Sequence, residues 1–167
     1  GMGVDGIKKI SLLKKFELEQ SIGFNFGEKN LLVTYHPVTL ENNSTEIQIQ
    51  ELLNSLNKLA DTKIIFTRPN SDTNGRIINK YINNFVNNNT QRSIAITNMG
   101  QKNYLSTLQF VDAVVGNSSS GLLEAPTFKI GTVNIGDRQK GRLKADSVID
   151  CNAKQESISV AIDKIYS

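Results

Sequence analysis

The sequence predicts an α/β fold, a Rossmann-like doubly wound parallel sheet with helices on both faces. Short apolar runs, such as residues 30–36 and 63–67, alternate along the chain with segments whose apolar residues recur at helical spacing. This alternation is typical of right-handed helical crossovers between parallel strands. In addition, unusual polar and glycine-containing segments follow the ends of these runs, where ligands bind in such sheets.

The chain is expected to start with an interlobe linker and an opening helix over residues 1–29, followed by the Rossmann-like domain over residues 30–167. The opening helix should run from about Ser11 to Gln20, with Gly23 as a left-handed C-cap. The first strand, residues 30–36, stops at Pro37 because proline cannot donate to a sheet ladder. Gly1 ahead of Met2 is typical of a scar left by tag removal, so we expect a piece of a longer protein.

The helices that follow carry both start signals and apolar stripes. Thr45 and Gln48 have capping-box spacing, which predicts a helix start there and an apolar stripe that continues to Leu59. Asn74-Gly75 is expected to open the next helix. Further strands are expected at residues 93–97, 113–115, 130–135 and 147–150, and further helices at 104–111, from the serine tract to near Pro126, and at 158–165.

Composition narrows the class of protein. With 167 residues, 38% hydrophobic and 21% charged, the chain has the size and balance of one globular domain. The net charge of +3 is too small for a dedicated nucleic-acid binder. The single cysteine, Cys151, excludes an internal disulfide and leaves no cluster for structural zinc. No apolar run approaches the ~20 residues of a membrane span, so we expect no membrane partner and a cytoplasmic protein.

The strongest candidate for a ligand site is the tract Gly116-Asn-Ser-Ser-Ser-Gly121, which joins an apolar run to a helix. Backbone N–H groups at a helix start, together with small hydroxyl side chains, can bind an anion such as phosphate. The standard ATP and dinucleotide fingerprints are absent. A helix N-cap is the alternative, but a cap needs one serine and the tract supplies a run of them. We therefore interpret the tract as a phosphate site.

Other candidates also follow strand ends. His36, the only histidine, could donate a hydrogen bond to a pyrophosphate or could be structural. Glu124 could accept both hydroxyls of a ribose or could favour the helix dipole, and the sequence weights these two roles equally. Arg138, between Gly136 and Gly141, could reach an anionic ligand or belong to a solvated charged turn.

Two weaker observations complete the candidate site. Asn70 belongs to the turn Arg68-Pro69-Asn70, which follows the second strand and is a weaker example of the same pattern. No pair of acidic residues with an obvious catalytic spacing is visible in the sequence.

In this order, segments 33–39, 68–72, 115–124 and 134–142 resemble the C-terminal half of UDP-N-acetylglucosamine 2-epimerases. The last segment is similar to the hydrolysing, sialic-acid-pathway branch of that family. The resemblance covers nearly the whole chain. It implies one lobe of a GT-B fold, in which two Rossmann-like lobes bind a UDP-sugar between them.

The resemblance also implies roles for individual residues. Ser118 and Ser119 would bind the phosphates of UDP, Glu124 the ribose, and the segment near Met99 the uracil. His36 and Arg138 would lie near the pyrophosphate, His36 as the tentative catalytic group that helps the diphosphate leave, and Asn70 would belong to the UDP-binding set. Hydrolysing members eliminate UDP across C1 and C2 to give a glycal, to which water adds to yield N-acetylmannosamine. We expect no cofactor and no metal.

The family's catalytic carboxylates belong to the N-terminal lobe, which fits the missing acid pair. We therefore expect this chain to be inactive alone, its partner to be the missing N-terminal lobe of its own chain, and the parent to be a homo-oligomer. The end at Ser167 looks short of the family's closing helix. Alternatives are the donor lobe of another GT-B glycosyltransferase and a non-catalytic nucleotide-sugar-binding module. The substrate stays open between UDP-N-acetylglucosamine and a diacetylated bacillosamine nucleotide.

Overall fold

The computed structural model describes residues 11–38, 42–70, 72–136 and 147–167. Its strands are β1 (Lys29–Thr34), β2 (Thr62–Thr67), β3 (Ser93–Ile96), β4 (Ala113–Gly116), β5 (Gly131–Ile135) and β6 (Val148–Cys151). They form a six-stranded sheet in the order β3-β2-β1-β4-β5-β6, and every adjacent pair is parallel. This is the strand order of a Rossmann fold, so the predicted fold class is confirmed.

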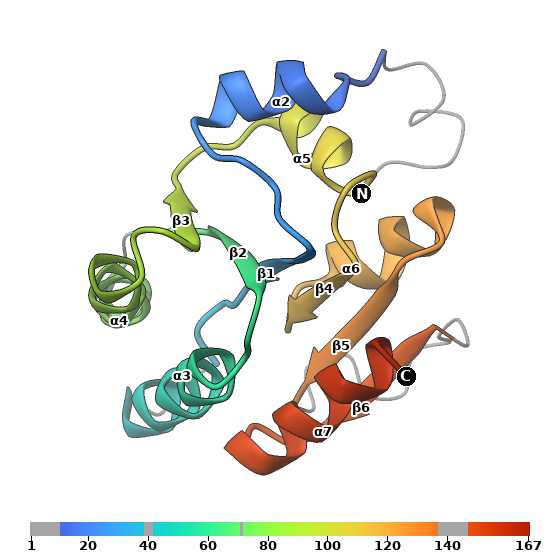
Figure 1. Ribbon diagram of the computed structural model, residues 1–167. Helices are drawn as coiled ribbons and strands as arrows, with labels where there is room; N and C mark the ends of the chain where they lie inside the picture. Colours follow the sequence, from blue (N-terminus) through green and yellow to red (C-terminus); the bar gives the residue numbers. More distant parts are fainter. Residues whose placement is uncertain (1–10, 39–41, 71, 137–146) are drawn as a thin grey trace.

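Helices cover both faces of this sheet (Figure 1). One face carries α3 (Asn42–Asn57), α4 (Thr73–Asn88) and α7 (Gln155–Ile165). The other face carries α2 (Lys15–Ile22), α5 (Gln101–Thr107), α6 (Ser119–Glu124) and the 3-10 turn η1 (Ala125–Phe128). Within the described ranges, no helix is long and apolar enough to cross a membrane.

The hydrophobic core has two layers because side chains of a strand alternate between the faces of a sheet. In β1, Leu31 and Val33 belong to the layer under α3, α4 and α7, whereas Leu32 belongs to the layer under α5 and η1. These three side chains are at most 1% exposed. A strand buried on both faces has a continuous apolar run, which is why β1 could be recognised from sequence.

Some predicted boundaries are wrong, and local contacts explain why. The first strand ends at Thr34, two residues before the predicted end at His36. Thr45 is not the N-cap of a capping box, because α3 already begins at Asn42 and Thr45 is fully buried within it. Its hydroxyl instead donates to the carbonyl of Val38 at 3.2 Å. The spacing of Thr45 and Gln48 could not predict this hydrogen bond to Val38.

Other helix ends are shifted by a few residues. Asn74-Gly75 lies in the first turn of α4, whose N-cap is Asp72, with Oδ1 accepting from the Gly75 N–H at 2.8 Å. The opening helix runs from Lys15 to Ile22 rather than from Ser11 to Gln20. Its predicted C-cap is confirmed, since Gly23 has φ 71°. Helix α5 begins at Gln101 and ends at Thr107, earlier than the predicted residues 104–111, although Val111 is still buried.

Tyr166, the residue directly after α7, is hydrogen-bonded to the start of the central strand pair, β1 and β4. Asp112, directly before β4, accepts a hydrogen bond from the Asn30 N–H at 2.8 Å through Oδ2. The same oxygen accepts from the Tyr166 hydroxyl at 2.9 Å. Burial, and then the hydrogen bond to Asp112, raise the pKa of the Tyr166 phenol well above its ordinary value of 10.0. Tyr166 is therefore held neutral as a hydrogen-bond donor.

We expect Tyr166→Phe to lower the free energy of unfolding by about 1 kcal/mol near neutral pH, because the hydrogen bond to Asp112 is lost while the ring remains. The folded-state pKa of Tyr166 is raised, so the unfolded state ionises first as pH rises past about 10. The wild type then loses stability that the variant never had. Thermal unfolding from about pH 8 to about pH 11 should show the difference between the proteins narrowing. A constant or growing difference would contradict this assignment.

Candidate functional site

The candidate site lies where the chain changes direction across the sheet, between β1 and β4. The helix that follows β1 packs on one face and the helix that follows β4 packs on the other, which makes this a topological switch point. Thr34 ends β1 and is in register with Thr67 of β2 and with Gly116 of β4. The hydroxyls of Thr34 and Thr67 are hydrogen-bonded at 2.6 Å.

Gly116 allows β4 to approach β1 unusually closely at this point. Its φ is 146°, and a β-carbon added there would lie 1.7 Å from the carbonyl oxygen of Thr34. No side chain fits such a separation, and L-residues rarely adopt this backbone conformation. Directly after Gly116, the Asn117 N–H donates to the same Thr34 carbonyl at 3.3 Å. Glycine at position 116 is therefore required by the packing of the two strands.

The side chain of Asn117 continues the pairing beyond the end of β4. Its Oδ1 accepts from the His36 N–H at 2.8 Å, and its Nδ2 donates to the His36 carbonyl at 3.0 Å. Asn117 is fully buried. An amide can accept and donate at the same time, so this side chain takes the place of a neighbouring strand's backbone. The sequence placed Asn117 in the tract but gave no sign of this contact.

Two predicted phosphate-binding residues follow Asn117 directly. Ser118 and Ser119 are both half-buried, and Ser119 is the first residue of α6. The first N–H groups of a helix have no acceptor within the helix, so they are available to an anion. Because α6 has only six residues, these local N–H groups contribute more than a helix macrodipole. Through Asn117, the structure places the backbone of His36 beside the residue that directly precedes Ser118 and Ser119.

The position of α6 is set by its contact with the sheet. A β-carbon on Gly121 would lie 3.1 Å from Cγ2 of Thr132 and 3.3 Å from Cγ1 of Val114. The Thr132 hydroxyl donates to the Gly121 carbonyl at 3.0 Å. Since β4 and β5 both contact the helix at this residue, the start of α6 is fixed relative to the strand ends.

Glu124 does not lie near the start of the helix, where a carboxylate would have to lie to stabilise the helix dipole. It is the last residue of α6, directly before η1, and is 8% exposed. A carboxylate stabilises a helix dipole only within the first turn, so the dipole interpretation is not supported for α6. The ribose role of Glu124 stays a prediction.

The remaining predicted residues lie further along the same edge of the sheet or outside the described ranges. Asn70 is exposed, after the end of β2. Met99 is half-buried between Asn98 and Gly100, both of which have positive φ, and packs against the core layer that contains Leu105. Arg138 lies outside the described residues.

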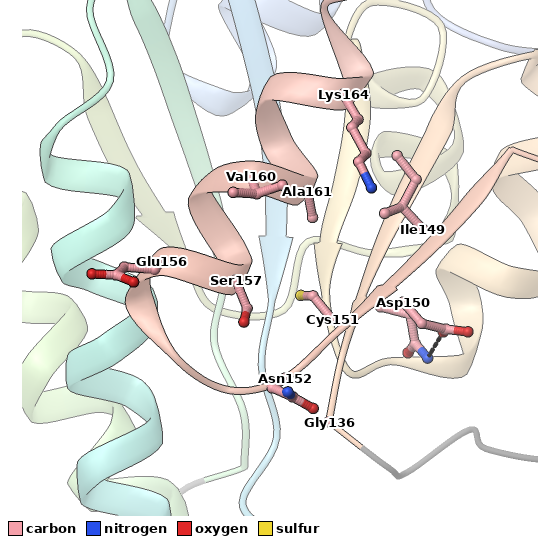
Figure 2. A pocket seen from close by; sticks show the side chains of 11 residues that line it. Gly136, Ile149, Asp150, Cys151, Asn152, Glu156, Ser157, Val160, Ala161 and Lys164 are labelled. Carbon is pink, nitrogen blue, oxygen red and sulfur yellow. Dashed lines mark hydrogen bonds between the residues drawn. The ribbon is translucent and has the colours of Figure 1, made fainter.

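A separate pocket of about 540 Å³ lies at the carboxyl ends of β5 and β6, beside α7 (Figure 2). Its residues include Asn134, whose Nδ2 donates to Oδ1 of Asp150 at 2.8 Å, and Cys151. Burial and the nearby Asp150 raise the pKa of the Cys151 thiol to about 11, so it is protonated at neutral pH and a poor nucleophile. Among the described residues, none of the predicted site residues lines this pocket and no metal-binding cluster occurs.

Known proteins match this chain both in sequence and in fold. The chain is 38% identical over 161 residues to the GDP/UDP-N,N'-diacetylbacillosamine 2-epimerase (hydrolyzing) of Campylobacter jejuni, covering 96% of this chain and 41% of the relative. It is 35% identical to the polysialic acid biosynthesis protein P7 of Escherichia coli, covering 94% of this chain and 40% of the relative. The chain thus spans about 40% of the length of these curated relatives.

Solved structures agree on the fold. The S. aureus MnaA–UDP co-structure superposes with a TM-score of 0.72 at 12% identity, over 98% of this chain and 44% of that protein. Sucrose-phosphate synthase from Thermosynechococcus elongatus superposes with a TM-score of 0.63 at 11% identity, over 99% of this chain and 42% of that protein. At these identities the superpositions speak for the fold alone.

The strand order and the glycine-serine turn at the switch point therefore define one Rossmann-like lobe of the GT-B type. The chain belongs to the UDP-N-acetylglucosamine 2-epimerase family, whose sequence profile matches residues 2–167. The predicted family is confirmed.

We expect Gly116→Ala to destabilise the fold more than Gly136→Ala. Both glycines have positive φ at a strand end, so both substitutions carry a backbone cost of about 1–3 kcal/mol. A β-carbon on Gly136 meets none of the described residues within 4 Å, whereas one on Gly116 collides with the Thr34 carbonyl. Urea unfolding should place Gly116→Ala at least about 2 kcal/mol below its matched control. Equal losses would argue against the close approach of β4 to β1.

Proposed function

We propose that this chain is the C-terminal, UDP-binding lobe of a hydrolysing UDP-sugar 2-epimerase. The observation that carries the proposal is the position of His36 beside the serine tract, hydrogen-bonded through Asn117 at the switch point of the sheet. The 38% identity to a relative named as a hydrolysing 2-epimerase supports it.

In this proposal the lobe binds the diphosphate and stabilises it as it leaves. The hydroxyls of Ser118 and Ser119 and the first N–H groups of α6 donate to phosphate oxygens. His36 donates a further hydrogen bond and carries positive charge when protonated. During elimination the proton on C2 is removed by a base on the other lobe, the bond between C1 and the diphosphate oxygen breaks, and UDP departs as an anion. Donors placed where that charge develops lower the barrier.

The rest of the nucleotide would follow the edge of the sheet. Glu124 would accept hydrogen bonds from the ribose hydroxyls, and the segment around Met99 would lie against the uracil. Asn70 and Arg138 complete the proposed set. This arrangement needs no cofactor, and it is supported by related structures from S. aureus, in complex with UDP, and from Methanocaldococcus jannaschii, in complex with UDP-GlcNAc and UDP.

We expect the 167-residue chain to bind UDP weakly, because one wall of the ligand cleft belongs to the other lobe. Replacing both Ser118 and Ser119 by alanine should weaken binding by about tenfold or more in calorimetry, through the loss of hydrogen bonds to a charged group. Ser157→Ala, in the first turn of α7 and away from the switch point, is the matched control and should leave affinity unchanged. Equal affinity of the double variant and wild type would argue against the phosphate site.

The isolated chain should not turn over UDP-N-acetylglucosamine. The base that takes the C2 proton is proposed to lie on the other lobe, and UDP binding alone does not lower the barrier to proton removal. Chromatography of the reaction should show no free UDP and no N-acetylmannosamine above the uncatalysed level. The parent protein carrying both lobes is the positive control. Turnover by the purified 167-residue chain would overturn the division of roles between the lobes.

Two alternative functions keep the same nucleotide site. One is the donor lobe of a GT-B glycosyltransferase, a class that shares this fold, and the other is a free-standing nucleotide-sugar-binding module. Incubation of the parent with a UDP-sugar, with and without an acceptor, separates them. A hydrolysing 2-epimerase releases UDP without an acceptor, a transferase requires one, and a binding module releases none.

A further inference from the structure

We propose that Asn117 is a positioning residue that holds His36 against the diphosphate, an inference that rests on the proposed function. No ligand contact is assigned to Asn117 itself. Its role is to fix the backbone from which the His36 side chain projects.

The geometry shows why one side chain can do this. Strand β1 ends at Thr34 and β4 ends at Gly116, so backbone pairing between them stops short of His36. The Asn117 amide spans the gap by accepting from the His36 N–H at 2.8 Å and donating to its carbonyl at 3.0 Å. Both polar groups of the His36 backbone are thereby fixed relative to the residue that precedes the serine tract.

Pro37 strengthens this restraint. The residue before a proline is sterically confined to extended backbone conformations, and His36 occupies that position. Proline also has no N–H group, so it cannot extend the strand pairing itself. The backbone of His36 is therefore held by the Asn117 amide more than by the hydrogen bonds of the sheet.

Asn134 provides a matched control for removal of a buried amide. It lies on the neighbouring strand β5, in register with Gly116, and is 2% exposed. Its Nδ2 donates to the Asp150 side chain rather than to the His36 backbone. Asn134→Ala should therefore reduce stability through a similar loss without changing the direction of His36.

A double-mutant cycle tests whether Asn117 acts through His36. Calorimetry with UDP compares wild type, Asn117→Ala, His36→Ala and the double variant. We expect each single variant to lose about tenfold in affinity, and the double variant to bind no more weakly than His36→Ala alone. Asn134→Ala should bind within about twofold of wild type. If Asn117→Ala does not fold, Asn117→Asp replaces it in the same cycle, because aspartate keeps the size and the acceptor oxygen of asparagine. An effect of the new charge that is independent of His36 would add to the effect of His36→Ala and would be recognised in that way.

The single histidine offers a direct spectroscopic measurement. The imidazole C–H resonances of the chain arise only from His36, so their titration with pH and their shift on adding UDP can be followed without assignment. In wild type and Asn134→Ala we expect UDP to shift these resonances and their titration midpoint. In Asn117→Ala the response should be lost at UDP concentrations that saturate the site, while the rest of the spectrum stays folded.

The outcomes separate this inference from the function on which it rests. If the wild type binds UDP but Asn117→Ala binds equally well, or its effect adds fully to that of His36→Ala, the positioning role is wrong and the UDP site stands. If the wild type shows neither heat nor an imidazole shift with UDP, the proposed function fails and the inference fails with it.

Discussion

The pairing of β1 with β4 is the contact on which the rest of this domain depends. These strands come from distant parts of the chain and join the two halves of the sheet, so their register places β2 and β3 on one side and β5 and β6 on the other. Side chains secure the pair at both ends. Asp112 bonds the Asn30 N–H before β4 begins, and Asn117 bonds His36 after β4 has ended. The closure entropy of the long intervening chain is therefore offset by contacts beyond the ladder itself.

This arrangement fixes the start of α6 relative to the strand ends without a large scaffold around it. The ends of β1 and β4 are joined by backbone contacts, by the Asn117 amide and by the close approach at Gly116. Helix α6 then packs against β4 and β5 at Gly121. The proposed phosphate-binding groups at the start of this short helix are therefore positioned by neighbouring strands. Preorganisation of this kind lowers the cost of binding an anion.

Much of the fold could be predicted from sequence because local signals agreed with tertiary structure. Strands buried on both faces appear as continuous apolar runs, so the centre of β1 around Leu32 was found even though its end was placed at His36 rather than Thr34. Gly23 was recognised as a C-cap because left-handed backbone favours glycine. The error at Thr45 arose because its hydroxyl donates to the carbonyl of Val38, seven residues upstream, and the capping-box spacing does not describe that contact.

The candidate site was only partly predictable for the same reason. Strand-end rules located His36 and the serine tract, since such rules depend on topology alone. They could not reveal that the Asn117 side chain bonds the His36 backbone, because the two residues lie 81 positions apart. The end of the helix near Pro126 was predicted, and Glu124 lies at that end as the last residue of α6 before η1.

Gly116 has a consequence for how related sequences should be compared. The Thr34 carbonyl excludes any side chain at position 116, and this constraint holds whether or not a nucleotide is bound. A descendant that had abandoned catalysis would still need glycine there to fold, while the hydroxyl groups of Ser118 and Ser119 could drift freely. Retention of this glycine is therefore evidence of shared architecture, and under the proposed function the serines that follow are the better markers of retained chemistry.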